Sequence, residues 1–206
     1  THGQKAFNGV ALISRHPIED VVRGLPAVDG SPDTTDEQAR YIEATIKGVR
    51  IASIYLPNGN PRPGPKFDYK LAWMERLAAH AARLRLTELP TVLAGDYNVI
   101  PQDIDCHNPP AWVDDALTQP ESRGWLRTII NMGYTDALRQ IKPEGAAYSY
   151  WDFQRGAWQK DHGIRIDHLL LSPQAADLLV ACDVDRIPRG KEKSSDHTPV
   201  WIELDI

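Results

Sequence analysis

TVLAGDYN, residues 91–98, is the stretch that constrains the fold of this chain most strongly. Its first half is an almost continuous apolar run, which is typical of a strand buried on both faces of a sheet. Pro90 separates this run from the segment before it. The run ends in Gly95-Asp96-Tyr97-Asn98, so the sequence predicts a buried strand that delivers an acid and an amide to its end.

A second polar stretch, Ser195-Asp196-His197-Thr198-Pro199-Val200, introduces another predicted strand near the end of the chain. We expect the two strand ends to aim acids, an amide and an imidazole at one place. That combination suits metal-assisted attack on a phosphodiester, because an anion must be held, a water deprotonated and growing negative charge absorbed.

Composition predicts one globular domain over residues 1–206, since the chain has 42% hydrophobic residues and a net charge of −5. Cys106 and Cys182 belong to no Cys-x-x-Cys or Cys/His cluster, so neither a disulfide framework nor a zinc knuckle is indicated. No apolar stretch approaches the ~20 residues of a membrane span, and no signal peptide is recognisable. The expectation is a cytoplasmic protein without a membrane partner.

Net acidity counts mildly against a nucleic-acid partner, which usually requires a basic face. Basic residues nevertheless gather in loops, where they form either a positive rim around an acidic centre or ordinary solvated charge. These residues are Arg62, Lys66, Arg186, Arg189, Lys191 and Lys193.

Periodicity predicts a strand-rich chain with a few helices. The expected strands are 9–15, 41–46, 49–56, 91–98, 148–153, 164–171, a weaker one at 183–187, and 200–206. Helices are expected at 67–86, at 121–132 and, briefly, after Pro173; Lys70 falls mostly on the polar side of the first. Residues 101–120 are predicted to form a long irregular loop. This pattern favours sheets packed on each other with helices outside.

Several motifs along the chain carry a family resemblance. In order they are Asn8-Gly9-Val10-Ala11, Tyr55-Leu56-Pro57-Asn58-Gly59, Gly95-Asp96-Tyr97-Asn98, Trp125-Leu126-Arg127, Gly163-Ile164-Arg165-Ile166-Asp167-His168-Leu169-Leu170 and Ser195-Asp196-His197. Over essentially all 206 residues, the chain resembles the exonuclease III family of the endonuclease/exonuclease/phosphatase superfamily.

The resemblance implies an α+β fold, a four-layer α/β/β/α sandwich of two mainly antiparallel sheets. Family members begin with a Trp-Asn-Val-Asn strand, a helix and a strand ending Gln-Glu, and neither motif occurs here. We therefore expect the chain to lack its first strands and helix. We expect a monomer, although an uncovered sheet edge invites pairing with another chain.

The implied activity is DNA repair: hydrolysis of phosphodiesters 5′ to abasic sites and removal of nucleotides 3′ to 5′ from duplex DNA. The implied cofactor is Mg²⁺ or Mn²⁺, and its main ligand, the Glu of the absent Gln-Glu motif, is missing. Because a hard cation needs several oxygen ligands, our hypothesis is that these 206 residues bind magnesium poorly and show little or no nuclease activity.

Roles for individual residues also follow from the resemblance. His197, oriented by Asp167, would stabilise charge on the phosphate, and Asp96 would orient or deprotonate the attacking water. Asn98 would hold a phosphate oxygen and position Asp96, with both side chains on one face of an extended strand. Tyr55 would offer its phenol to the phosphate.

Further residues are expected to bind metal or substrate. Asp196 is the acidic candidate for metal coordination, and Asn58 is expected to contact the DNA backbone. Tyr150, Ile164 and Ile166 are expected to line an apolar pocket for the base-free sugar. The alternative is that these last side chains only fill the core.

Three alternative functions stay open on the sequence. One is another phosphodiesterase or phosphatase of the superfamily, acting on inositol lipids or sphingomyelin. The second is an inactive DNA-binding module, and the third is a structural or interaction protein without phosphate chemistry.

Overall fold

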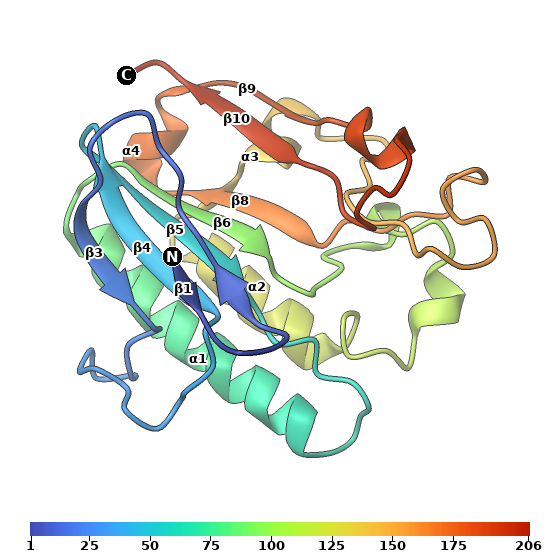
Figure 1. Cartoon of the computed structure of the whole chain (residues 1–206), viewed down its shortest axis with the longest axis horizontal. Coiled ribbons are helices and arrows are strands. Elements are labelled where there is room, and N and C mark those ends of the chain that lie inside the picture. Colours follow the sequence, from blue (N-terminus) through green and yellow to red (C-terminus); the bar gives the residue numbers. More distant parts are fainter.

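A computed structural model describes all of residues 1–206, and a six-stranded mixed sheet runs through its centre (Figure 1). In spatial order its strands are β3 (Glu19–Arg23), β4 (Tyr41–Ile46), β5 (Val49–Tyr55), β6 (Thr91–Asp96), β8 (Asp167–Leu171) and β7 (Thr135–Asp136). Only β5 and β6 are parallel neighbours. The helix α1 (Pro65–Leu86) provides the crossover that parallel pairing requires.

One face of this sheet is covered by α1 and α2 (Pro120–Asn131), which lie side by side behind it in Figure 1. Trp73, Met74 and Leu77 of α1 pack against Leu93 of β6 in the largest apolar cluster. Pro65 begins α1, where its missing N–H costs no hydrogen bond. The predicted helix and its apolar stripe are confirmed, but the expected place of Lys70 is wrong, because this lysine is fully buried.

A smaller antiparallel sheet, β9 (Leu179–Val184) with β10 (Val200–Leu204), packs over the other face. Val92 of β6 and Leu171 of β8 share an apolar cluster with Cys182 of β9. The short elements are β1 (His2–Gly3), β2 (Gly9–Val10), α3 (Ala137–Ile141) and α4 (Pro173–Ala176). The α+β class, with two packed sheets and helices outside, is therefore confirmed. The outer face of the smaller sheet exposes Val180 and Trp201.

The predicted hairpin is confirmed by the pairing of β4 with β5, and the second helix by α2. Segment 9–15 is shorter than expected, because only Gly9–Val10 pairs. Segment 148–153 forms isolated bridges instead of a strand: Tyr150 bridges both Ile164 and His197. The weak strand near 183–187 lies earlier in the chain, as β9. Periodicity missed β3, β7 and α3, which are short or have exposed side chains.

The long loop is irregular as predicted, apart from two turns of 3-10 helix at Asp103–Asp105 and Pro109–Trp112. None of the helices combines the length and the apolar character needed to cross a membrane.

Candidate active site

Strand register brings three of the predicted site residues into one row. Tyr55 is paired with Asp96 across β5 and β6, and Asp96 is paired with Asp167 across β6 and β8. Residues directly opposite each other in a sheet point to the same face, so these side chains are neighbours. All three stand at the same end of the large sheet and line one surface cleft with Asp196 and His197.

A tight turn places Asn98 beside Asp96. Gly95 has φ 146°, and a Cβ there would lie 2.0 Å from the carbonyl oxygen of Ile54, so only glycine fits. Strand β6 ends at Asp96, and Asn98 has φ 46°, a conformation that asparagine tolerates better than most residues. The expectation that an extended chain puts Asp96 and Asn98 on one face is therefore wrong, since a turn brings them together.

Asn98 is buried, and its side-chain amide forms its hydrogen bonds with other groups of the protein. Its backbone N–H donates to Asp96 Oδ1 at 2.8 Å, and its Nδ2 donates to Asp96 Oδ2 at 3.0 Å and to the Leu56 carbonyl at 2.9 Å. Asn58 Nδ2 donates to Asn98 Oδ1 at 3.0 Å. An amide carries two hydrogens, so this arrangement positions Asp96 and leaves no Asn98 N–H for a phosphate.

Lys70 of α1 connects the loop that contains Asn58 with the loop that contains Asn98. Its ammonium donates to the carbonyl oxygens of Asn98 at 2.5 Å and of Asn58 at 3.0 Å. Burial lowers the pKa of Lys70 to about 7, against the opposing pull of the Asp115 and Asp96 carboxylates.

His197 is oriented by Asp167. Its Nδ1 lies 2.8 Å from Asp167 Oδ2, and the same carboxylate oxygen accepts a hydrogen bond of 2.6 Å from the Ser149 hydroxyl. Ser149 Oγ in turn accepts from the backbone N–H groups of Ile166 and Asp167. The partner on Nδ1 leaves Nε2 of the half-buried imidazole available to a ligand.

Two titratable groups of the first cleft, Asp96 and His197, have strongly shifted pKa values. Burial, together with the Asp167 carboxylate, raises the pKa of Asp96 to about 7, although the nearby His197 lowers it. Burial alone would lower the pKa of His197, but its hydrogen bond and charge interaction with Asp167 prevail and raise it to about 9. At neutral pH the site therefore holds an imidazolium beside a carboxyl group poised to gain or lose a proton.

A second cleft adjoins the first and shares Tyr55, Asp96 and His197 with it. Tyr150, Ile164 and Ile166 line this cleft, where the Tyr150 ring meets the His197 ring edge-on at 5.0 Å between centroids. Asn58 and Asn98 line it as well. Trp112, Asp115 and Leu117 of the long loop complete its wall, and sequence reasoning had assigned them no role.

Asp196 is the residue predicted to coordinate a metal ion. Asp196 lines the first cleft, but the contact that its carboxylate makes is with the Ser195 hydroxyl at 3.3 Å. No three His, Cys, Asp or Glu side chains in residues 1–206 gather closely enough to hold a metal ion. Mg²⁺ demands near-octahedral oxygen coordination, so the residues present do not by themselves fit this ion.

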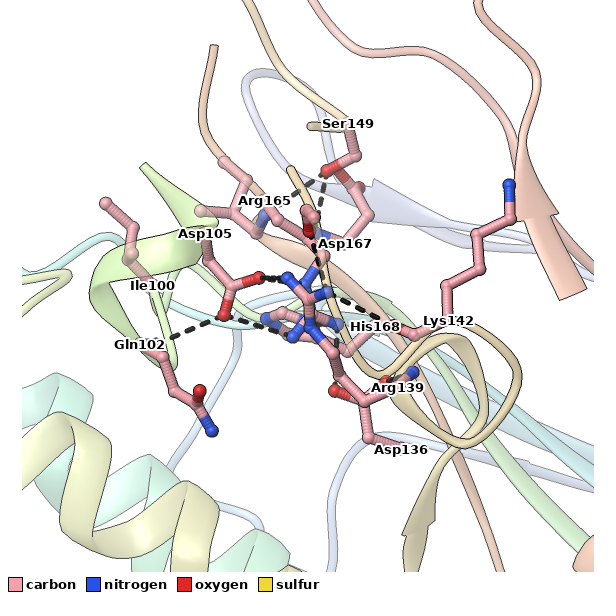
Figure 2. Close-up of polar contacts among 12 residues, drawn as sticks. Ile100, Gln102, Asp105, Asp136, Arg139, Lys142, Ser149, Arg165, Asp167 and His168 are labelled. Atoms are coloured by element: carbon pink, nitrogen blue, oxygen red, sulfur yellow. Dashed lines mark hydrogen bonds and ion pairs between the residues drawn. The ribbon is translucent and has the colours of Figure 1, made fainter. Parts of the chain in front are cut away.

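A buried ionic network supports the strand that carries Asp167 (Figure 2). Arg165 donates to both oxygens of Asp105, at 2.7 and 3.2 Å, and to Asp136 Oδ2 at 2.8 Å. Its Nη1 also lies 3.2 Å from His168 Nδ1. An arginine can only donate, so His168 accepts there and donates from Nε2 to the Val99 carbonyl, 2.9 Å away. The network fixes the long loop against β7 and β8.

Sequence reasoning gave no role to Lys70, Ser149 or Arg165, although all three support the site. A signal existed for Arg165, because strand alternation places it on the face opposite Ile164 and Ile166. Nothing local distinguishes Lys70 from the other charged residues of its helix or Ser149 from a loop serine.

Comparison with known proteins gives a consistent result. Residues 1–197 match the sequence model of the Endonuclease/Exonuclease/phosphatase family. Exodeoxyribonuclease III of Haemophilus influenzae is 29% identical over 215 residues, covering 98% of this chain and 79% of that protein.

Two solved structures are similar over 94% of this chain and 73% of their own. The 3′-5′ exonuclease NExo from Neisseria meningitidis is 38% identical, with a TM-score of 0.88. An AP endonuclease from Archaeoglobus fulgidus is 32% identical, with a TM-score of 0.86.

Proposed function

This chain belongs to the endonuclease/exonuclease/phosphatase family, and from that membership we propose that it acts as an exodeoxyribonuclease III-like DNA repair nuclease. Its substrate is duplex DNA with abasic sites or 3′ ends. It hydrolyses the phosphodiester 5′ to an abasic site and removes nucleotides 3′ to 5′.

The observation that carries the proposal is the row of Tyr55, Asp96 and Asp167, with His197 bound to the last of them at 2.8 Å. Hydrolysis of a phosphodiester needs a base for water and positive charge for the phosphate. Asp96, with a pKa of about 7, is the base that accepts a proton from the attacking water. His197, with a pKa of about 9, is the cation that donates from Nε2 to a phosphate oxygen.

The other predicted residues take supporting roles. Asn98 positions Asp96, and Tyr55 faces the same phosphate from β5. Tyr150, Ile164 and Ile166 form the wall against which the base-free sugar packs, because this part of the cleft is apolar. Asn58, exposed beside them, contacts the DNA backbone.

Nucleases of this family generally use divalent metals. We assign Asp196 to such an ion, Mg²⁺ being the candidate, as the one carboxylate of the cleft that neither orients His197 nor serves as the base. The further oxygen ligands that Mg²⁺ needs are not gathered among residues 1–206. We therefore expect weak magnesium binding and slow turnover by these residues alone.

The test is single-turnover cleavage of an end-labelled abasic duplex by excess protein, with magnesium and with a chelator. We expect a slow cut on the 5′ side of the abasic site that leaves a 3′ hydroxyl, and no cut with chelator or with Asp96→Asn. An intact duplex and a phospholipid analogue are tested in parallel.

Three outcomes contradict parts of this proposal. Hydrolysis of the phospholipid analogue in place of DNA points to a lipid phosphodiesterase. Tight binding of the abasic duplex without any cut points to an inactive binding module. Fast cleavage contradicts only the expectation of weak metal binding.

A further inference from the structure

A basic cleft beside the candidate active site has no role in the function proposed above. It lies between residues 152–159 and 189–194 and is lined by Arg189, Lys191, Lys193, Ser194, Phe153 and Trp158, among others. We call this group the basic cleft. Its chain segments adjoin the site, since the Trp151 N–H donates to the Asp196 carbonyl at 2.9 Å.

Arg189 is a buried cation without an anion. It is 7% exposed, and its guanidinium donates to the Trp151 carbonyl at 2.9 Å and to the Ser194 hydroxyl at 3.1 Å, while its buried Nε has no partner. The other buried arginines, Arg50 and Arg165, each pair with carboxylates. Burying a charge without a partner costs free energy. We therefore expect the Arg189 guanidinium to be compensated by the anion of a bound ligand.

The neighbouring charges have the same sign. Lys191 and Lys193 are exposed, and neither forms an ion pair with a carboxylate. Asp152 is the only acid that lines the basic cleft, and it does not pair with Arg189. A chain with a net charge of −5 thus concentrates unpaired positive charge in one hollow next to its candidate active site. Such a concave field attracts an anion.

An exposed aromatic ring lies within the same cleft. Phe153 is 65% exposed, and the Arg189 guanidinium lies 5.2 Å from its ring centroid and 5.6 Å from that of Trp158. An exposed phenyl ring beside unpaired cations suits a nucleotide, because the base can stack on the ring and the anionic phosphate can bind the cations. A free inorganic anion needs only the cations.

We propose that the basic cleft binds a single-stranded stretch of DNA, with phosphates on Arg189, Lys191 and Lys193 and a base stacked on Phe153. The proposal rests on the proposed function, because the bound strand is the one held at the candidate active site. Lys193 and His197 are four residues apart, at most about 14 Å of extended chain. The cleft therefore holds nucleotides that lie close to the phosphodiester to be cut and favours substrates with a frayed or unpaired end.

The test is fluorescence anisotropy with a short labelled oligothymidylate and a blunt duplex, in chelator so that nothing is cut. Lys191→Glu/Lys193→Glu is compared with Lys5→Glu/Lys47→Glu, which changes the net charge equally at exposed lysines elsewhere. The cleft variant should weaken oligothymidylate binding about tenfold or more and reduce the salt slope by about 1.4. The control should change binding less than about twofold at physiological ionic strength.

Phe153→Ala is the second variant, and as an exposed side chain it can be removed without loss of the fold. It should weaken oligothymidylate binding about fivefold or more, because a stacked base is lost. Blunt duplex should be much less affected. Circular dichroism and thermal unfolding check that each variant is folded.

Equal losses for the cleft and control lysine pairs, or no effect of Phe153→Ala, overturn the proposal and reduce the cleft to general surface charge. Weaker oligothymidylate binding in both the cleft lysine variant and Phe153→Ala supports the proposal, whether or not the protein cleaves abasic DNA. Cleavage that proceeds while both variants bind like the parent chain supports the proposed function and overturns the cleft assignment alone.

Discussion

At the residue scale, Asp96 and His197 show how neighbouring charges set the chemistry of the candidate site. Asp167 acts on both: its charge raises the pKa of Asp96 and, by its hydrogen bond, that of His197. Raised pKa values on a proton acceptor and a cation within one cleft are a common sign of acid-base function.

The pKa of Asp96 provides a prediction with a definite sign. A carboxyl group with a pKa of about 7 becomes a base as pH rises through 7, so the single-turnover rate should rise with pH there. It should fall again as pH rises through about 9, where His197 loses the proton that it donates to the phosphate. Asp167→Asn should lower the Asp96 pKa by removing a like charge. His197→Ala should raise it by removing a cation. Carboxyl-carbon NMR shifts of Asp96 measured against pH test both directions, and shifts of the same sign in both variants would contradict this electrostatic account.

Lys70 gives a second prediction at the same scale. Lys70→Met keeps the apolar stem but leaves the buried carbonyl oxygens of Asn58 and Asn98 without a donor, each costing about 1–3 kcal/mol. The free energy of unfolding, measured in urea, should therefore fall by about 2–6 kcal/mol. Lys66→Met, at an exposed position of the same helix, is the control and should have little effect. Equal midpoints for the two variants would show that the ammonium does not hold these loops.

At the scale of elements, the parallel pairing of β5 with β6 places Asp96 beside Tyr55 at the end of the sheet. Gly95 lies within this pairing, and its φ of 146° lets the backbone pass directly against Ile54. The site therefore depends on a backbone approach that no side chain allows.

Gly95→Ala should be strongly destabilising for this reason. The added Cβ would meet the Ile54 carbonyl oxygen at 2.0 Å, and backbone cannot move aside as a flexible side chain can. We expect a loss of more than about 3 kcal/mol, measured as a fall in thermal midpoint. Gly3→Ala, where nothing lies within 4 Å of the added carbon, serves as the control. A thermal midpoint for Gly95→Ala near that of the control would mean that β6 can shift.

At the scale of the whole molecule, Arg165 joins segments that are remote in sequence. It links Asp105 of the long loop with Asp136, the last residue of β7, and it lies just before β8 (Figure 2). Long loops are usually mobile, yet this one forms a wall of the second cleft. The buried ionic network is the physical reason that it can do so.

Arg165→Met should therefore cost about 3–5 kcal/mol, because it leaves Asp136 without its cation and leaves the fully buried Asp105 with Arg139 alone. Lys142→Met removes a largely exposed ion pair with Asp183 and should cost less than about 1 kcal/mol. Chemical denaturation compares the two. Hydrogen exchange in residues 101–119 should accelerate in Arg165→Met alone, and unchanged protection there would contradict the structural role given to the network.

The long, strongly periodic elements were predictable from the sequence. The hairpin of β4 and β5, the helices α1 and α2 and the buried core of β6 follow from apolar periodicity, which depends on near neighbours along the chain. The segments β3, β7 and α3 were missed because short or exposed elements carry little periodicity. Residues 148–153 alternate like a strand, but isolated bridges to Ile164 and His197 take its place.

The sequence by itself determined the apolar patterns and the motif order that identify the family, because both are written in local stretches of chain. Only the tertiary structure decided which polar groups meet. Strand register aligns Tyr55, Asp96 and Asp167. The turn after Gly95 brings the Asn98 amide to the Asp96 carboxylate. Lys70, which looks like a surface charge in the sequence, is buried and holds two loops by hydrogen bonds. Arg189 likewise looks like any loop arginine until folding buries it without a carboxylate. Hydrogen bonds and pKa values depend on distance and dielectric, and folding alone sets both.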